Sequence, residues 1–542
     1  MRTAAAPTNP HFSDASPKTA PRPRLDERAM DRAAGVLLGA AAGDALGVPY
    51  EFRARLREDQ VPQMLGGGLG NYEPGEFSDD TQMQAAIAAV SATGADMRTE
   101  AALDAVAQNF LSWLASGPAD IGSQTRQVLS AAKRASATQA PARAMLAASR
   151  EFTRTRSHSA GNGSLMRTGI VALSHLDDPT AMAQAATLVS ELTHADPDCA
   201  DACVLWCSGV RRAVLDGTFD GVREGLALLP ADRRQLWTQR LDEAEANPPH
   251  HFERSNGWVV SALQAAWSAI VHTPVPDLDP ARGTFPAQHF QLAAEAAVRA
   301  GNDTDTVAAI AGALLGARWG CSAIPLAWQQ AVHGWPGLQG HDLVSLAVRT
   351  ARGGTDDADG WPSQPRTRTP LSSGRPFSAA HPYDKGIILG NQALTEDHRP
   401  GPVDAVVSLC RVGTGPILAA NDTEHIRVWL VDKTGANSNL HYALDQAATE
   451  VLRLRAEGKT VLVHCVAGAS RTPAVAALCA VRSEGVTART ALRSVRSVLG
   501  SWRLADHREL HDAVYELAGQ KPVHFVPASW RRPKWLERLA RR

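Results

Sequence analysis

The stretch KTVLVHCVAGASRTPAVAAL, residues 459–478, decides the fold class of the C-terminal part of this chain. Its first seven residues are rich in valine and other apolar types, which predicts a buried strand that ends at Cys465. A short loop containing Gly468 follows, and a helix is predicted from Arg471 onward. A strand, a tight loop and a helix in this order indicate an α/β unit.

The flanking sequence continues this alternation. VDAVVSLC (403–410) and HIRVWLVD (425–432) are further short β-rich runs, and helical stretches such as LHYALDQAATEVLRLRAEG (440–458) separate the strands. Strands that alternate with helices favour a largely parallel sheet. The sequence therefore predicts an α/β domain with a central, mostly parallel sheet over residues 376–518.

The loop after Cys465 is suited to binding an anion. Inward-pointing backbone amides and the positive end of the following helix both stabilise negative charge. Cys465 is therefore expected to have a lowered pKa and to act as a nucleophile toward phosphate. The planar guanidinium of Arg471 matches two phosphoryl oxygens, and Thr472 can donate a hydrogen bond to the sulfur. The predicted phosphate-binding residues are Val466, Ala467, Gly468, Ala469, Ser470 and Arg471.

The segment HCVAGASRT (464–472) resembles the signature of the dual-specificity and tyrosine phosphatases, in which a cysteine and an arginine flank five residues. The resemblance covers roughly residues 376–518. It implies hydrolysis of phosphate monoesters, with Asp432 in the loop after HIRVWLVD as the general acid. Asp422 is the alternative acid. A phosphate-binding pseudophosphatase with the same loop is the alternative interpretation of the domain.

The N-terminal part of the chain has a different pattern. Between residues 31 and 352, apolar residues recur three and four positions apart, as in DRAAGVLLGAAAGDALG (31–47) and TVAAIAGALLGARWG (306–320). This spacing is typical of amphipathic and buried helices, and alternating strand patterns are scarce. The sequence predicts a compact all-α domain over residues 28–352.

Two acidic stretches in this domain each precede a predicted helix, FSDDT (77–81) and NDTDT (302–306). Taken singly, each is an ordinary helix N-cap. Taken together they offer carboxylate and hydroxyl oxygens, which hard divalent cations prefer as ligands. If the fold joins them, they can hold two Mg²⁺ ions, with Mn²⁺ as an alternative. The candidate ligands are Ser78, Asp79, Asp80, Asp303, Asp305 and Thr306.

Four other stretches accompany these two: GVLLGAAAGDALGVPYEF (35–52), SAGNGSLMR (159–167), LTHADP (192–197) and GWVVSALQAAW (257–267). Together they follow the order found in the ADP-ribosylglycohydrolase family. This part of the chain resembles that family over roughly residues 31–352. The resemblance implies an all-helical fold. It also implies metal-dependent hydrolysis of the bond between the anomeric carbon of ADP-ribose and an acceptor side chain, with Glu51 and Asp80 acting in catalysis. The implied ADP-ribose-binding residues are Ser159, Asn162, Gly163 and His194.

Two positions depart from the family pattern. Ser78 stands where the family usually has threonine, and Asn302 stands where it usually has glycine. Serine keeps the hydroxyl ligand, and asparagine can adopt the left-handed backbone conformation that a glycine would supply. Neither change removes a predicted ligand.

Composition limits the partners and the compartment. The formal net charge of −1 and the pI near 7.0 give no general attraction to nucleic acid or to a membrane. The longest uninterrupted apolar run, at 307–317, is shorter than the roughly 18–20 residues that span a bilayer. Seven cysteines without zinc-site spacing suit the reducing cytoplasm. Three of them, Cys199, Cys203 and Cys207, are predicted to share a core-facing side of one helix.

Three further segments are predicted to lie outside the two domains. Residues 1–27 are expected to form a disordered lead, and residues 353–375 an interdomain linker. Residues 519–542 are expected to form a basic C-terminal extension, either packed on the phosphatase-like domain or contacting phosphates or acidic lipid.

Three functions agree with the sequence. The chain is a bifunctional hydrolase, or an ADP-ribosyl hydrolase whose C-terminal domain only binds phosphorylated partners, or a phosphatase whose helical domain senses ADP-ribose. The expected substrate is an ADP-ribosylated and phosphorylated protein or a metabolite derived from ADP-ribose.

Overall fold

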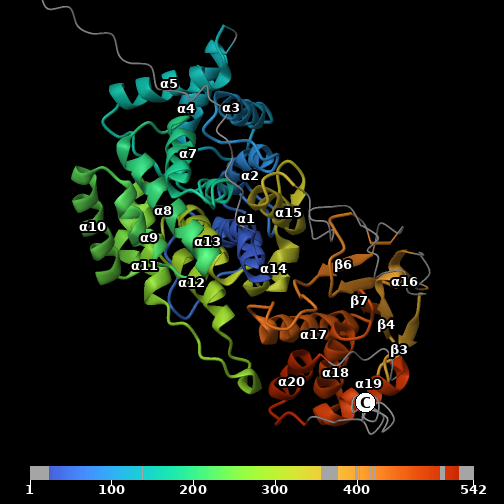
Figure 1. Ribbon diagram of the computed structural model, residues 1–542. Coiled ribbons are helices and arrows are strands. Elements are labelled where there is room, and N and C mark those ends of the chain that lie inside the picture. The colour runs from blue at the N-terminus through green and yellow to red at the C-terminus, as the bar shows by residue number, and fades with distance from the viewer. Residues whose placement is uncertain are drawn as a thin grey trace, which may run out of the picture.

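The computed structural model describes residues 24–136, 138–355, 376–396, 401, 403–415, 417–418, 423–500 and 507–523. It contains a large helical domain and a smaller domain built on a sheet, which lie side by side (Figure 1). Most of the predicted lead, the predicted linker and the predicted C-terminal extension lie outside the described residues, as does Asp422.

The helical domain begins at α1, where the Asp26 carboxylate accepts a hydrogen bond from the Ala29 amide and caps the helix. Its helices, 3₁₀ segments (η) and one short strand pair are α1 (Glu27–Gly47), η1 (Val48–Tyr50), α2 (Asp79–Ser91), α3 (Glu100–Ala115), α4 (Ser123–Ala135), α5 (Pro141–Thr155), η2 (Asn162–Ser164), α6 (Val171–Ser174), α7 (Pro179–Glu191), α8 (Pro197–Asp216), α9 (Gly221–Glu224), η3 (Gly225–Leu228), α10 (Ala231–Ala246), η4 (Pro249–Ser255), α11 (Val259–His272), η5 (Pro280–Arg282), η6 (Pro286–Gln288), α12 (His289–Val298), α13 (Thr304–Trp319), η7 (Cys321–Ala323), α14 (Leu326–Ala331), β1 (His333–Gly334), β2 (Leu338–Gln339) and α15 (Gly340–Ala351).

Helices α1 and α13 cross at the centre of this domain with their backbones in contact. A Cβ atom added to Gly39 would lie 2.4 Å from the carbonyl oxygen of Gly312, and one added to Gly43 would lie 2.0 Å from that of Ala308. Only glycine permits so close an approach. The contact matters for the site because it sets the distance between α1 and the acidic stretch at the start of α13.

The segment Glu27–Tyr50 is long and apolar enough to cross a membrane by length and composition, although 94% of its apolar window is buried inside the domain. A count of uninterrupted apolar residues misses this segment because Asp44 interrupts it. The cysteines predicted to face the core, Cys199, Cys203 and Cys207 on α8, are all buried.

The smaller domain has a five-stranded sheet in the order β3-β4-β7-β5-β6. Strand β3 is antiparallel to β4, and all other neighbours are parallel, which confirms the predicted mostly parallel sheet. Its elements are β3 (Ser378–Ala380), β4 (Ile387–Asn391), α16 (Gln392–Glu396), β5 (Ala405–Ser408), β6 (Glu424–Arg427), α17 (Leu440–Ala456), β7 (Val461–Cys465), α18 (Arg471–Glu484), α19 (Ala488–Leu499) and α20 (Arg508–Leu517).

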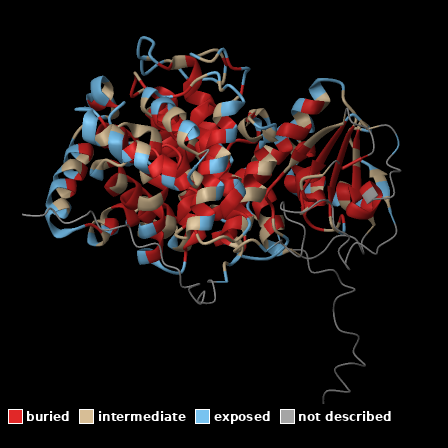
Figure 2. Ribbon diagram, turned by 90° about the horizontal axis from the view of Figure 1, so that it is seen from above, coloured by how far each residue is buried: buried red, intermediate tan, exposed pale blue. Residues whose placement is uncertain are grey.

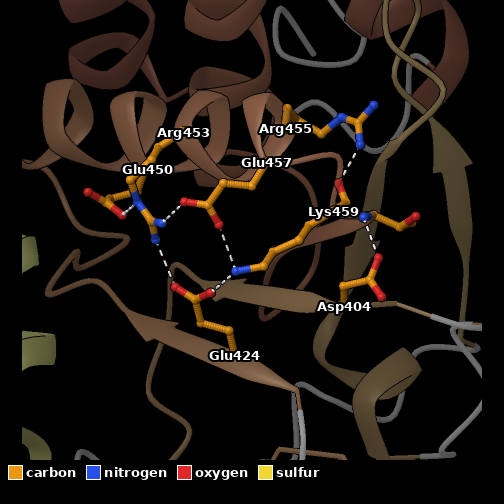
Figure 3. Close-up of polar contacts among 8 residues, drawn as sticks. Asp404, Glu424, Glu450, Arg453, Arg455, Glu457 and Lys459 are labelled. Carbon is orange, nitrogen blue, oxygen red and sulfur yellow. Dashed lines mark hydrogen bonds and ion pairs between the residues drawn. The ribbon is translucent and has the colours of Figure 1, made fainter.

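A charged network joins the end of α17 to strand β6 (Figure 3). Arg453 contacts Glu450 at 2.8 Å and Glu424 at 2.7 Å, and Lys459 contacts Glu424 at 2.5 Å. Glu457 pairs with both cations. Glu424 is therefore ion-paired with two cations, which it shares with Glu450 and Glu457.

The two domains share apolar packing. Trp429 and Tyr442 of the smaller domain belong to the core of the helical domain, and the rings of Tyr442 and Phe285 lie 5.5 Å apart between centroids. The Asn439 amide donates hydrogen bonds to the Trp319 carbonyl at 2.6 Å and to the Ser322 hydroxyl at 2.8 Å. Figure 2 shows the buried residues concentrated along the central helices of the larger domain and along the strands of the smaller one.

Candidate active sites

The two acidic stretches meet at one place in the helical domain, where the start of α2, the start of α13 and the end of α1 come together. Carboxylate oxygens of Asp44, Asp80 and Asp305 lie within 4.8 Å of one another, and those of Glu51, Asp303 and Asp305 form a second such group. Asp305 belongs to both groups. The fold therefore forms two adjoining acidic groups, each able to hold a cation.

Asp44 holds the first of these groups together. It is fully buried on α1. One carboxylate oxygen accepts hydrogen bonds from the Ser78 amide at 3.0 Å and the Ser78 hydroxyl at 2.8 Å. The other accepts from the Thr81 amide at 3.0 Å and the Thr81 hydroxyl at 2.6 Å. The Ser78 hydroxyl also lies 3.1 Å from Asp80. Four donated hydrogen bonds fix the start of α2 against α1 and orient the acidic side chains.

Burial and mutual repulsion raise the pKa values of these carboxyl groups. Burial and neighbouring carboxylates raise the pKa of Asp79 to about 8 and that of Glu51 to about 9. The same causes raise the pKa values of Asp80 and Asp305 well above the usual range. Burial raises the pKa of Asp44 to about 6, although hydrogen bonds oppose it. Crowded buried carboxylates stay ionised only when positive charge balances them, as in a divalent-cation site.

The loop carrying Glu51 is tied to the start of α13. Asn302 has a φ of 58°, the left-handed conformation allowed for by the sequence, and its carbonyl accepts a hydrogen bond from the Phe52 amide at 2.7 Å. The side-chain amide of Asn302 (Nδ2) donates to the side-chain oxygen of Asn256 at 2.7 Å. These bonds bring Glu51 to the second acidic group.

Asn162 and Gly163, predicted to bind ADP-ribose, lie beside the acidic residues. The Asn162 amide donates to Asp303 at 2.7 Å. A Cβ atom on Gly163 would lie 3.0 Å from the His194 ring, so glycine makes room for that imidazole. Burial, with the charge of Arg167, lowers the pKa of His194 well below its usual value and keeps the ring neutral.

Ser159, the fourth residue predicted to bind ADP-ribose, is held differently. Its hydroxyl donates a hydrogen bond to Asp196 at 2.8 Å. Thr306 lies in the first turn of α13, and its backbone amide donates to the Asp305 carboxylate at 2.9 Å. The structure thus places the six predicted metal ligands in one region, where their coordinating roles stay predictions.

Sequence reasoning missed two acidic residues of this region, Asp44 and Asp120. Asp120 faces the cluster and contributes to the raised pKa values of Asp79 and Glu51. An aspartate inside an otherwise apolar helix is costly to bury unless it has partners. That cost was the signal for Asp44, whereas Asp120 stands in a loop without a recognisable motif.

The second site lies at the end of β7, the central strand of the sheet. Burial opposes ionisation of Cys465, but the charge of Arg471 and the nearby hydroxyl and backbone amide of Thr472 outweigh it and lower the pKa of the thiol. Gly468 in the loop has a φ of 66°, and a Cβ atom there would lie 2.5 Å from the Phe377 ring. The loop therefore depends on glycine for its tight path.

Asp432 reaches this loop from beyond the end of β6. Its carboxylate accepts a hydrogen bond from the Ser470 hydroxyl at 2.6 Å and lies 3.6 Å from Arg471. His507 lies 3.7 Å from its other oxygen. Arg471 also donates to the Leu430 carbonyl at 3.0 Å. A carboxylic acid beside the anion loop is placed to protonate a leaving oxygen.

Alkylation of Cys465 is expected to depend on Arg471. A lowered pKa gives more thiolate below pH 9 than an unperturbed thiol has, so iodoacetamide should react with Cys465 at pH 6.5. Arg471→Met removes the stabilising charge, and the rate at pH 6.5 should fall about tenfold for each unit by which the pKa rises. Mass spectrometry of the Cys465 peptide measures the rate, with exposed Arg489→Met as the control. Equal rates in Arg471→Met and the wild type would contradict the assignment.

Comparison with known proteins agrees with the division into two domains. The family model described as ADP-ribosylglycohydrolase matches residues 25–358, and the model of the dual specificity phosphatase catalytic domain matches residues 401–506. The chain is 28% identical over 308 residues to the ADP-ribosyl-[dinitrogen reductase] glycohydrolase of Rhodospirillum rubrum, covering 55% of this chain and 89% of that protein. It is 29% identical over 317 residues to the ADP-ribosylarginine hydrolase Tri1 of Pseudomonas putida, covering 56% and 75%.

Solved structures are similar to each part. A chain of an ADP-ribosylglycohydrolase-related protein complex is 25% identical, with a TM-score of 0.45, over 61% of this chain and all of that one. Human DUSP28 is 18% identical, with a TM-score of 0.24, over 27% of this chain and 97% of its own.

The fold and the two sites define a two-domain hydrolase. The acidic helical site and the cysteine loop lie in separate domains, each with its own matching family. The chain belongs to the ADP-ribosylglycohydrolase family, and its C-terminal domain is a dual-specificity phosphatase domain.

Proposed function

We propose that the protein is a bifunctional hydrolase that removes ADP-ribose from a modified acceptor in a metal-dependent reaction and hydrolyses phosphate monoesters with Cys465 as the nucleophile. The observation that carries the first activity is the sharing of Asp305 by two acidic groups. The residues that would hold two divalent cations are Ser78, Asp79, Asp80, Asp303, Asp305 and Thr306, joined by Asp44.

The chemistry of this donor set fits Mg²⁺ or Mn²⁺, because every donor is a carboxylate or hydroxyl oxygen. Bound divalent cations would supply positive charge that orients ribose hydroxyls and a water molecule. The protein's own part is to position ADP-ribose through Asn162, Gly163 and His194. Glu51 lies close enough to the acidic groups to exchange a proton there, and its raised pKa suits a proton-transfer role.

For the second activity, the residues act in sequence. Cys465 would attack phosphorus while Arg471 holds two phosphoryl oxygens, and Asp432 would give a proton to the leaving oxygen. Water would then release phosphate from the cysteine, with the Thr472 hydroxyl stabilising the departing sulfur. The lowered pKa of Cys465 supports this role.

The experiment measures both activities in one protein preparation. ADP-ribosylated arginine, serine and nucleic-acid substrates and ADP-ribose-1″-phosphate are offered to the full chain with and without EDTA, alongside para-nitrophenyl phosphate. The proposal expects ADP-ribose release that EDTA abolishes and phosphate release that EDTA does not affect. The proposal would be refuted if Cys465→Ser kept the phosphatase activity and Asp305→Asn kept the release of ADP-ribose.

Metal binding is expected to stabilise the protein more strongly at high pH. The folded pKa values of Asp44, Asp79 and Glu51 lie above the unfolded values of about 4, so the metal-free folded state binds more protons than the unfolded state between pH of about 4 and about 9. The stability of metal-free protein therefore falls as pH rises through this window.

Added Mg²⁺ balances the carboxylates, and the free energy of unfolding should rise by about 3 kcal/mol at 100 times the dissociation constant. Differential scanning fluorimetry at pH 5.5 and pH 8.5, with EDTA or Mg²⁺, compares the gains in melting temperature. A gain that is as large at pH 5.5 as at pH 8.5 would count against this electrostatic account.

We further propose that the acceptor is a protein side chain and that the enzyme works in the cytoplasm. The first point is supported by the names of the relatives, which include an ADP-ribosylarginine hydrolase. The second is supported by the seven cysteines, which are all buried and form no disulfide with one another in the described structure.

A further inference from the structure

A cavity of about 340 Å³ lies between the two domains, and none of the candidate active-site residues lines it. The helical domain contributes Leu326 of α14 and Val344 of α15, and the smaller domain contributes His425, Arg427 and Trp429. A cavity of this size at a domain boundary is typical of small-molecule sites.

Arg427 gives the cavity its charge. Its Nε and Nη2 atoms donate to the carbonyls of residues 413–415 at 3.1–3.3 Å, while Nη1 makes no hydrogen bond with any described residue. Burial lowers the pKa of Arg427 to about 10, so it stays charged at neutral pH. The lining carboxylate of Glu424 is ion-paired with Arg453 and Lys459 outside the cavity wall. The Nη1 atom of Arg427 is therefore the charged donor that an anion in the cavity can contact.

The remaining wall is suited to a planar ring. Trp429, Val344 and Leu326 are apolar and buried, and the exposed amides of Gln330 and Gln339 stand at the rim, where they can donate to and accept from a heterocycle. An anion with a planar, hydrogen-bonding ring satisfies both parts of the cavity. We propose that this cavity binds a nucleoside 5′-monophosphate, with its phosphate against Arg427 and its base against the apolar wall.

A chain of hydrogen bonds leads from this cavity to the phosphatase loop. The Nε2 atom of His425 lies 2.8 Å from the Ser408 hydroxyl, and that hydroxyl lies 2.7 Å from Nε2 of His464, the residue before Cys465. The single hydroxyl proton of Ser408 can serve only one of the two rings, so the other ring must donate to it. The tautomer of His425 thus sets that of His464, and a ligand that binds beside His425 changes the surroundings of the nucleophile.

Binding is tested by calorimetry on the full chain carrying Cys465→Ser, which prevents turnover of the ligand. AMP, GMP, UMP, ribose 5-phosphate and inorganic phosphate are the probes. A nucleotide is expected to bind with a dissociation constant on the order of 10 µM. Arg427→Gln should weaken binding at least about tenfold.

Gln330→Trp should also weaken binding by obstructing the rim, without removing any hydrogen bond from the fold. Exposed Arg282→Gln is the control and should leave binding unchanged. Binding that persists unchanged in both cavity variants would place the nucleotide at an active site and overturn the proposal. If inorganic phosphate bound as tightly as the nucleotides, the proposal that the base packs against the apolar wall would be wrong.

Coupling is tested with para-nitrophenyl phosphate, and this part rests on the proposed phosphatase activity, which the same assay measures without nucleotide. The nucleotide should change kcat at least twofold in the wild type, whereas competition at the phosphatase loop would change only KM. The asparagine side chain of His425→Asn is too short to reach Ser408. This variant should bind the nucleotide with a dissociation constant within about threefold of the wild-type value, but the nucleotide should no longer change its kcat. An unchanged wild-type kcat at saturating nucleotide would refute the coupling.

Discussion

Replacement of Cys465 by serine is expected to reduce phosphate-ester hydrolysis by on the order of 10⁴-fold or more, the scale of losing a catalytic nucleophile. The serine hydroxyl has nearly the same shape as the thiol, but it ionises far less readily, so the charge stabilisation from Arg471 has no thiolate to act on. The rate of para-nitrophenyl phosphate hydrolysis measures the effect.

Cys479→Ser is the matched control, because Cys479 is also buried in this domain but lies on α18, beyond the loop that follows Cys465. It should retain phosphatase activity within a few fold, although burial of a hydroxyl lowers its stability. ADP-ribose release by Cys465→Ser should equal that of the wild type. If Cys465→Ser kept its phosphatase activity, the C-terminal domain would use another nucleophile. If the wild type had none, the domain would be a phosphate-binding module.

The second large effect is expected for Asp305→Asn. Because Asp305 belongs to both acidic groups, its replacement weakens two cation positions at once. Release of ADP-ribose from arginine-modified protein should fall by on the order of 10³-fold. Phosphatase activity should be unchanged, because the cysteine loop has its own domain and its own core.

The same variant should be more stable than the wild type in EDTA at neutral pH, because the raised pKa of Asp305 is a cost of folding that a neutral asparagine does not have. Asp232→Asn, exposed on α10, is the control and should leave both measurements unchanged. A metal-dependent activity within threefold of the wild type in Asp305→Asn would show that the shared carboxylate is not a ligand.

The sequence predicted the elements that depend on local patterns. Helical spacing predicted α1 and α13, and the run KTVLVHC predicted β7 with Cys465 at its end. The two short acidic stretches were recognisable because each precedes a predicted helix and because they occur with four other motifs in the order found in the ADP-ribosylglycohydrolase family. These signals are local, so one chain segment is enough to reveal them.

Features that depend on contacts between distant segments were not predicted. Asp44 acts through hydrogen bonds to residues 34 and 37 positions away. Its place in an apolar helix marks it as unusual, but no local pattern identifies those partners. The insertion of Trp429 and Tyr442 into the helical core could not be inferred either, because both residues also fit the core of their own domain. The order of the strands in the sheet likewise depends on pairing between remote segments.

The crossing of α1 and α13 has a consequence for how this protein can vary. Side chains elsewhere can be exchanged for others of similar volume, whereas Gly39 and Gly43 leave no such freedom, because main chain rests directly on main chain. A methyl group at either position would wedge the helices apart and pull Asp44 away from Asp305. These glycines therefore act as a spacer of fixed length for the acidic site, and substitutions there would alter its chemistry while every ionisable group remained in place.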